Sequence, residues 1–321
     1  GSEMCIRDRD GTYTNPVINA DYPDPDIIRV GEDFYMVSSS FVAMPGIPIC
    51  HSKDLINWRI IGHAYDSITF RPQYRMENEQ TAYSRLCWAP SIKYHDGTYY
   101  IGVNIADDGF VMFKSNKPEG PYSMHKFDKR LYDPGFFIDD DGTAYLLSAT
   151  NMNRDINIYK LDPSWTKPVL LVNTICKGLH RETPAIIKKD GEYYFFSSKA
   201  SGWYPSQTMY TSAADLGGEW TPMREIGNNS TFDAQFNRIS TVGKTCGVWS
   251  YHWGAQRKYK TPAGNFPRIS IAAFNKGYAS MDYYRYLEFS DKYGIIPVQN
   301  GKNLTLNVPV SYTHLTLPTT S

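Results

Sequence analysis

The sequence predicts an all-β protein built as a five-bladed β-propeller. Short β-rich runs bounded by Gly, Asp and Pro recur along the chain, whereas convincing helical periodicity is scarce. These runs return at intervals of about 45–65 residues, with about four strands in each unit. Units of that length and strand number are typical of propeller blades.

Four stretches have the pattern of β-hairpins, in which a strand, a turn rich in Gly and acidic residues and an aromatic-led strand follow one another. They are "IIRVGEDFYMV", "SIKYHDGTYYIGV", "FFIDDDGTAYLLS" and "AIIKKDGEYYFFS". Turns of this composition are those that tight hairpins demand. Aligning the turns on Asp33, Gly97, Gly142 and Gly191 gives intervals of 64, 45 and 49 residues.

Each hairpin is followed by a shorter element that ends in a turn and usually in an aromatic residue. These elements contain "HSKDLINW", "KSNKPEGPY", "KLDPSW" and "TSAADLGGEW", and they complete the outer part of each blade. A fifth, degenerate unit is expected through "FDAQFNRISTVGKTCGVWSYHWG". Five blades account for residues 11–300, which we predict to form one domain.

The two ends of the chain are expected to lie outside this domain. Residues 1–10 and the final "SYTHLTLPTTS" resemble translated sequencing-adapter read-through at the edge of a metagenomic reading frame. Residues 301–321 would then hold the truncated start of a second module, in "KNLTLNVPVS", and a foreign tail. Since a native signal peptide would be missing, a secreted or periplasmic location is compatible with this sequence and is the one we expect.

Charge and cysteine content argue against several functions. The chain has 33 basic and 33 acidic side chains and no block of Lys or Arg, which argues against nucleic acid or an anionic membrane as the partner. Its five cysteines are widely spaced without a CxxC pair, so neither a zinc site nor a disulfide framework is indicated. The aromatic content of 15% fits both strand packing and sugar stacking.

One position of the repeat carries acidic side chains. Nine residues before the four aligned turns are Asp24, Trp88, Asp133 and Glu182, each followed by Pro within two residues. The inner strands of a propeller begin around one mouth of its channel, so we expect three carboxyl groups to converge there beside Trp88. An Asp before Pro often only shapes a turn. Turn chemistry has no use for Glu, however, and no basic residue occupies the position, which favours a functional site.

Convergent carboxyl groups are what cleavage of a glycosidic bond with inversion requires. One carboxylic acid protonates the leaving oxygen and one carboxylate activates water, about 6.5–9.5 Å apart. A third carboxylate nearby raises the pKa of the acid by repulsion. Trp88 either offers an apolar platform to a sugar or is a buried residue that only packs against its neighbours in the protein. Arg181 would neutralise Glu182, but successive strand side chains alternate, so Arg181 is expected to face away.

Five stretches of the sequence together resemble glycoside hydrolase family 43. They are "NPVINADYPDPDIIRVGEDFYMVSSSF", "PGIPICHSKDLINWRIIGH", "CWAPSIKYHDGTYYI", "DPGFFIDDDGTAYLL" and "RETPAIIKKDGEYYFFSS". The resemblance implies a five-bladed catalytic propeller of the kind found in β-xylosidases, α-L-arabinofuranosidases, arabinanases and exo-galactanases. It also implies that Asp24 is the general base, that Asp133 tunes and orients the acid, and that Glu182 is the general acid.

The same resemblance suggests a substrate and further site residues. Terminal xylosyl or arabinofuranosyl units of plant cell-wall polysaccharide are the expected substrate, and no cofactor is expected to be required. Many relatives carry a fifth-blade His near a bound metal, often calcium, and here Gln235 or Asp233 would take its place. Further candidates for sugar contact, beside Trp88, are Phe41, Trp203, Arg238 and Tyr251.

Three alternatives remain open at this stage. The first is an exo-galactanase-type hydrolase of the same family, which "RETPAIIKKDG" and "SGWYPSQ" favour. The second is a catalytically inactive, carbohydrate-binding propeller, which would share the aromatic residues without needing an acid–base pair. The third is a sialidase-like propeller, which "SKDLINW" favours weakly because no arginine triad accompanies it. "IDDDG" lacks the spacing of a calcium-binding EF-hand and is interpreted as a hairpin turn.

Overall fold

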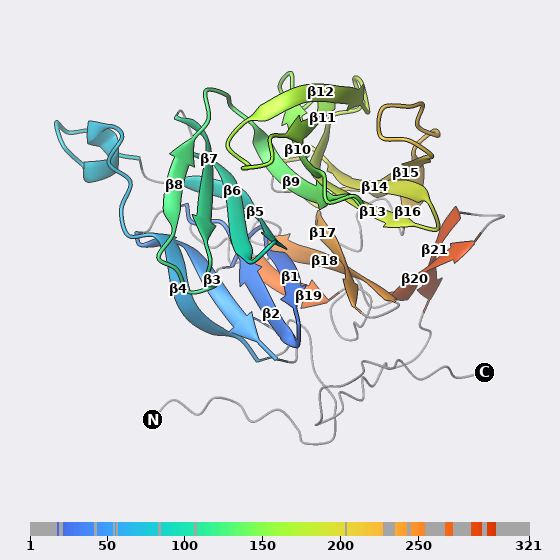
Figure 1. The fold of residues 1–321 in the computed structure, drawn as a ribbon, viewed down its shortest axis with the longest axis horizontal. Helices are drawn as coiled ribbons and strands as arrows, with labels where there is room; N and C mark the ends of the chain where they lie inside the picture. The colour runs from blue at the N-terminus through green and yellow to red at the C-terminus, as the bar shows by residue number, and fades with distance from the viewer. Residues whose placement is uncertain are drawn as a thin grey trace.

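The computed structural model shows antiparallel sheets arranged in a ring around a central axis (Figure 1). Side chains are described as far as residue 238 and the backbone alone beyond it. The described residues are 18, 22–41, 44–53, 55, 57–82, 85–105, 108–202, 204–226, 235–242, 245–253, 267–271, 284–290 and 294–299. In these ranges no helix is long and apolar enough to cross a membrane.

The first two blades are four-stranded sheets in which sequential strands pair as neighbours. Blade one consists of β1 (Asp26–Val30), β2 (Asp33–Val37), β3 (Gly46–Ser52) and β4 (Arg59–Tyr65). A short 3-10 helix, η1 (Pro72–Arg75), lies in the connection to the next blade. Blade two consists of β5 (Cys87–His95), β6 (Thr98–Ile105), β7 (Gly109–Ser115) and β8 (Ser123–Lys126).

The next two blades repeat this plan. Blade three consists of β9 (Tyr132–Ile138), β10 (Ala144–Thr150), β11 (Asp155–Leu161) and β12 (Pro168–Ile175). Blade four consists of β13 (Arg181–Lys189), β14 (Glu192–Lys199), β15 (Thr208–Ala213) and β16 (Arg224–Ile226). The four predicted hairpins are therefore β1–β2, β5–β6, β9–β10 and β13–β14.

The fifth place in the ring is taken by a three-stranded sheet. It consists of β17 (Gln235–Val242), β18 (Thr245–Trp253) and β19 (Pro267–Ile271), and a separate pair is formed by β20 (Tyr284–Ser290) and β21 (Gly294–Gln299). The inner strands β1, β5, β9, β13 and β17 contact one another in that order, and β17 also contacts β1. This closure confirms the predicted propeller and brings the starts of the inner strands together.

Apolar packing between neighbouring blades holds the ring together. Trp165 of blade three is 1% exposed and stacks on Tyr100 of blade two, with ring centroids 4.1 Å apart. Gly135 on β9 permits a close approach to blade four, because a Cβ there would stand 2.0 Å from the carbonyl oxygen of Pro184. The inner strands are thus fixed on both sides, which gives the groups that they carry a rigid frame.

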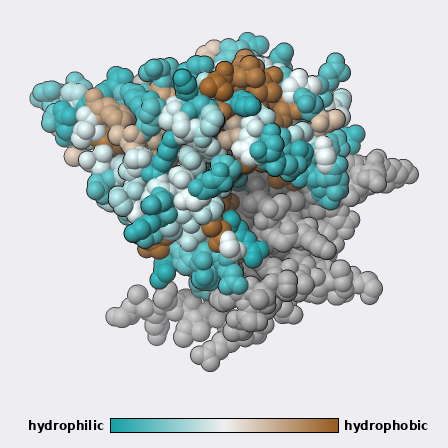
Figure 2. Space-filling view, in the orientation of Figure 1, coloured by the Kyte–Doolittle hydropathy of each residue, from teal (hydrophilic) through white to brown (hydrophobic). Residues whose placement is uncertain are grey.

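The outer edge of blade three shows an apolar patch. Val169, Leu170 and Leu171 on β12 are 52%, 57% and 50% exposed, and Figure 2 shows brown side chains gathered at the top of the molecule, where β12 lies. The strand β12 forms one edge of its sheet, whereas β9 forms the opposite, inner edge. The patch therefore lies on the periphery, away from the strands that carry the predicted site.

The pairing of the hairpins corrects the repeat alignment by one residue. Two-residue turns are closed by Val30 with Asp33, His95 with Thr98 and Lys189 with Glu192, so the equivalent of Gly97 is Glu32 and not Asp33. The β9–β10 turn is one residue longer and is closed by a hydrogen bond from the backbone N–H of Asp139 to the carbonyl of Thr143.

The truly equivalent residues share an unusual backbone. They all precede a proline and all have positive φ: Asp24 (51°), Ala89 (48°), Asp133 (47°) and Thr183 (53°). Such a conformation is rare outside Gly and is frequent at functional sites. Asp24 and Asp133 are therefore equivalent, as predicted. Glu182 and Trp88 are not equivalent to them, because each lies one residue before the positive-φ residue of its blade. Their equivalents in blades one and three are Pro23 and Tyr132.

Candidate active site

Asp24 lies directly before β1 and is held by the end of the neighbouring strand. Its side chain is 7% exposed, and its Oδ2 accepts a hydrogen bond of 2.5 Å from Ser39 Oγ. Ser39 Oγ in turn accepts a hydrogen bond of 2.7 Å from the backbone N–H of Ala89, in blade two. Asp24 is thus fixed by a bridge between two blades. A short bond to a carboxylate is stronger than a neutral one.

Asp133 lies at the start of β9, where the bend before Pro134 directs it toward the axis. Burial and the nearby charge of Asp24 raise its pKa to about 6. The opposing influences are the positive charge of Arg238 and a hydrogen bond from the backbone N–H of Thr183. The like charge of Asp24 acts on Asp133 although 109 residues separate the two in the sequence. The ring therefore brings these carboxyl groups together, as predicted.

Glu182 completes the group at the start of β13. Burial raises its pKa to about 9, and the charges of Asp133 and Asp24 act in the same direction. Arg181 and a hydrogen bond from the backbone N–H of Ser201 oppose this shift without cancelling it. Glu182 is half-buried, so solvent still reaches it. At neutral pH it is a protonated carboxylic acid able to give up its proton.

Arg181 does not pair with Glu182, in agreement with the prediction. Its guanidinium donates to the Ser197 side chain at 3.0 Å and to the carbonyls of Ser197 and Gln207 at 2.5 and 2.9 Å. The Arg181 side chain therefore turns toward β14 and the loop after it. Its charge is bound to neutral groups, which leaves the acid free to stay protonated.

An aromatic wall stands beside these carboxyl groups. Trp88 is 40% exposed at the start of β5, and Phe41 meets it edge-on, with ring centroids 5.1 Å apart. Tyr132, which sequence reasoning missed, is also 40% exposed and occupies the same register as Trp88 in blade three. Counting two residues back from each proline, instead of nine from each turn, would have found it.

Two other predicted sugar contacts lie beyond what the structure describes. Trp203 lies outside the described residues, and Tyr251 has a described backbone in β18 but no described side chain. Their contact with a sugar stays a prediction.

Arg238 is buried inside the ring and does not line an open surface. It is 3% exposed, and its Nη2 donates to the carbonyl of Pro134 at 2.6 Å, across the ring. Its Nε stands 3.5 Å from Asp26 Oδ2, which also accepts hydrogen bonds from Ser91 Oγ and the backbone N–H of Ile92. These bonds tie blades one, two, three and five together beneath the carboxyl groups.

Gln235 supports the loop that contacts the acid. Its side-chain nitrogen donates to Ser201 Oγ, the Gly202 carbonyl and the Tyr204 carbonyl at 3.2, 2.8 and 2.9 Å. Ser201 is the residue whose N–H bonds Glu182. The residues described include no group of three or more His, Cys, Asp or Glu arranged to hold a metal ion. Asp233 lies outside the described residues, and a calcium site near Gln235 remains a prediction.

Comparison with known proteins agrees with this geometry. The sequence matches glycosyl hydrolases family 43 over residues 13–257, three quarters of the chain. The chain belongs to glycoside hydrolase family 43. It is 35% identical over 202 residues to a β-xylosidase from Formosa agariphila, covering 58% of this chain and 34% of the relative. It is 36% identical over 199 residues to a non-reducing-end α-L-arabinofuranosidase from Bacteroides ovatus, covering 60% of this chain and 36% of the relative.

Solved structures support the fold of this family 43 chain. An exo-β-1,3-galactanase from Clostridium thermocellum superposes with a TM-score of 0.70 at 20% identity, covering 91% of this chain and 64% of that one. At this identity the likeness concerns the fold alone. The chain spans about a third of the length of the two curated relatives described above.

Proposed function

We propose that this family 43 chain hydrolyses terminal glycosidic bonds with inversion, with Glu182 as general acid and Asp24 as general base. The observation that carries the proposal is the meeting of three carboxyl groups at the starts of the inner strands, where burial first, and the charges of Asp133 and Asp24 second, raise the pKa of Glu182 to about 9. An acid of that pKa holds its proton at neutral pH, where it is needed for the leaving oxygen.

Asp133 is assigned the role of a positioning residue. Among the charged neighbours of Glu182, Asp133 raises the pKa of Glu182 the most. The Asp133 carboxyl group itself accepts a hydrogen bond from the backbone N–H of Thr183. In this scheme Asp24, fixed by Ser39, accepts a proton from the attacking water while Glu182 donates its own to the departing oxygen. The sugar lies between them, against Trp88 and Phe41.

Terminal β-D-xylosyl or α-L-arabinofuranosyl units of plant hemicellulose are the proposed substrates. The support comes from the two curated relatives, which are named for these activities. The exo-galactanase-type alternative has weaker support, because the galactanase shares the fold at only 20% identity.

A panel of 4-nitrophenyl glycosides tests the proposal. We expect turnover of the β-D-xylopyranoside or the α-L-arabinofuranoside, and proton NMR of the first-formed sugar should show the inverted anomer. Turnover of the β-D-galactopyranoside alone would support the exo-galactanase-type alternative instead. Binding without turnover of any member would identify a catalytically inactive carbohydrate-binding propeller, and a retained anomer would refute the assigned roles of Asp24 and Glu182.

A further inference from the structure

A cavity lies toward the other end of the inner strands, away from the three carboxyl groups. It has a volume of about 340 Å³, within the usual range for small-molecule sites. Its lining residues come from β1, β5, β9, β13 and the turn after β9: Ile27, Ile28, Arg29, Lys93, Tyr94, Phe137, Ile138, Asp140, Ile186, Ile187 and Lys188. They follow the carboxyl-bearing residues along these strands. Along the inner strands, the buried pair of Asp26 and Arg238 lies between the carboxyl-bearing residues and the residues that line the cavity.

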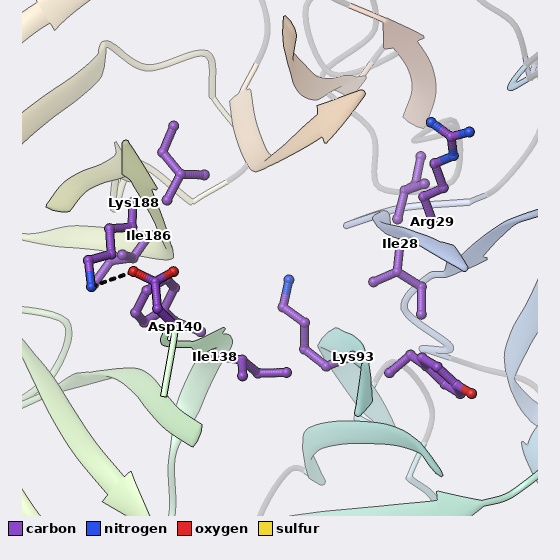
Figure 3. Close-up of a pocket in the computed structure, with 11 residues that line it drawn as sticks. Ile28, Arg29, Lys93, Ile138, Asp140, Ile186 and Lys188 are labelled. Atoms are coloured by element: carbon purple, nitrogen blue, oxygen red, sulfur yellow. Dashed lines mark ion pairs between the residues drawn. The ribbon is translucent and has the colours of Figure 1, made fainter. Parts of the chain in front are cut away.

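The walls of this cavity combine isoleucine side chains with charged and other polar groups, and one cation enters its centre. Figure 3 shows Lys93 extending between Ile138 and Ile186 on one side and Ile28 on the other. Burial lowers the pKa of Lys93, and the nearby charge of Arg238 adds to this effect against the opposing attraction of Asp26. Lys93 is therefore a poorly solvated amine that lies among isoleucine side chains.

The other charged groups of the cavity are already paired. Lys188 forms ion pairs of 2.7 Å with Asp139 and 2.8 Å with Asp140. Arg29 donates from its Nε to the carbonyl of Gly31 at 2.8 Å. Among the residues that the structure describes, Lys93 has no hydrogen-bond or ion-pair partner. Its charged neighbour Asp26 already accepts hydrogen bonds from Ser91 and Ile92 and forms an ion pair with Arg238.

We infer that this cavity binds a small monocarboxylate with a compact apolar body, whose carboxylate pairs with Lys93. Three cations and one carboxylate line the cavity, so its charge favours an anion. The isoleucine side chains would cover the apolar body, and a buried charge-assisted hydrogen bond would hold the carboxylate. Ile138 and Ile186 fix where the body lies relative to the amine. This inference is independent of the proposed hydrolysis, because the binding site shares no residue with the catalytic group.

Isothermal titration calorimetry with benzoate tests the inference on the full chain. We expect saturable binding of benzoate and about tenfold or weaker binding of benzyl alcohol, which has a similar body without the charge. Lys93→Met keeps the length of the side chain and should weaken benzoate binding about tenfold or more. Lys177→Met removes an exposed lysine elsewhere and should leave the affinity unchanged.

A second variant separates loss of binding from loss of fold. Ile138→Phe fills part of the cavity and should also weaken benzoate binding, while circular dichroism confirms that each variant is folded. Equal affinity of the wild type and Lys93→Met, or no saturable binding by the wild type, would overturn the inference. Activity on aryl glycosides is measured separately, so its failure would leave this result interpretable.

Discussion

The inner strands β1, β5, β9 and β13 hold charged groups in opposite ways at their two ends. At one end Asp24, Asp133 and Glu182 crowd together, and burial, reinforced by their mutual repulsion, raises the pKa values of Asp133 and Glu182. At the other end Lys188 is neutralised by Asp139 and Asp140. Like charges held together store unfavourable energy, whereas paired charges do not. The first end therefore gives up stability to keep a carboxylic acid protonated, as the proposed mechanism requires.

The largest effect is expected from removing the acid itself. Glu182→Gln should lower kcat on an aryl xyloside or arabinofuranoside by about 10³-fold, because general acid catalysis contributes about 10²–10⁴-fold. Glu192→Gln, at the opposite end of blade four, should retain near-full activity. Steady-state kinetics of both variants measure this difference, and comparable activity of the two would contradict the assignment of the acid.

Asp133→Asn should change the pH dependence as well as the rate. The charge of Asp133 helps to raise the pKa of Glu182, so its removal lowers that pKa. The alkaline limb of the kcat/KM profile, which reports loss of the Glu182 proton, should therefore move to lower pH by about one unit. Activity should fall by about 10–100-fold at the optimum. A lower rate with an unmoved alkaline limb would show that Asp133 acts by orientation alone.

The crowded end should also cost stability at neutral and alkaline pH. The folded-state pKa of Glu182, about 9, is above its ordinary value of 4.5, so the folded state binds the proton more tightly. Its contribution to stability is present below pH 4.5 and is lost as the pH rises toward 9. Glu182→Gln should therefore stabilise the fold at pH 8 by roughly 1–2 kcal/mol and by little at pH 4. Urea unfolding at the two pH values measures this, and an equal change at both would contradict it.

A smaller effect is expected from the bridge that holds Asp24. Ser39→Ala removes the donor to Asp24 and leaves the N–H of Ala89 without its acceptor. We expect a loss of about 1–3 kcal/mol in the free energy of unfolding and about a tenfold fall in kcat/KM. Ser123→Ala, which breaks an exposed hydrogen bond to Lys114, should cost less than about 0.5 kcal/mol. An equal loss in the free energy of unfolding for both variants would show that Ser39 does not bridge the two blades.

Much of the fold, and the meeting of the three carboxyl groups, was predictable from local chemistry. Gly and acidic residues mark the hairpin turns, and the recurrence of Pro marks the starts of inner strands. The exact equivalence was missed because the positive φ of Asp24, Ala89, Asp133 and Thr183 is a property of folded backbone and cannot be counted from turns. The predicted alignment was wrong by one residue, so it still identified residues at the starts of the inner strands.

Contacts between blades were beyond sequence reasoning. Ser39 reaches Asp24 and Ala89 only because blades one and two pack side by side. Arg238 was predicted to contact sugar, but it is buried and spans the ring to the carbonyl of Pro134, 104 residues away. No local pattern encodes such a distance. The aromatic Tyr132, in contrast, carried a usable signal in its spacing from Pro134.

The protonation state of Glu182 is the most direct test of this account. Carbon-13 NMR of protein labelled at the glutamate carboxyl carbons, with Glu182→Gln used to assign the signal, gives its pKa in the wild type and in Asp133→Asn. We expect a wild-type pKa far above 4.5 that falls clearly when the Asp133 charge is removed. A pKa near 4.5 in both proteins would contradict the claim that burial and the neighbouring carboxyl groups keep this acid protonated.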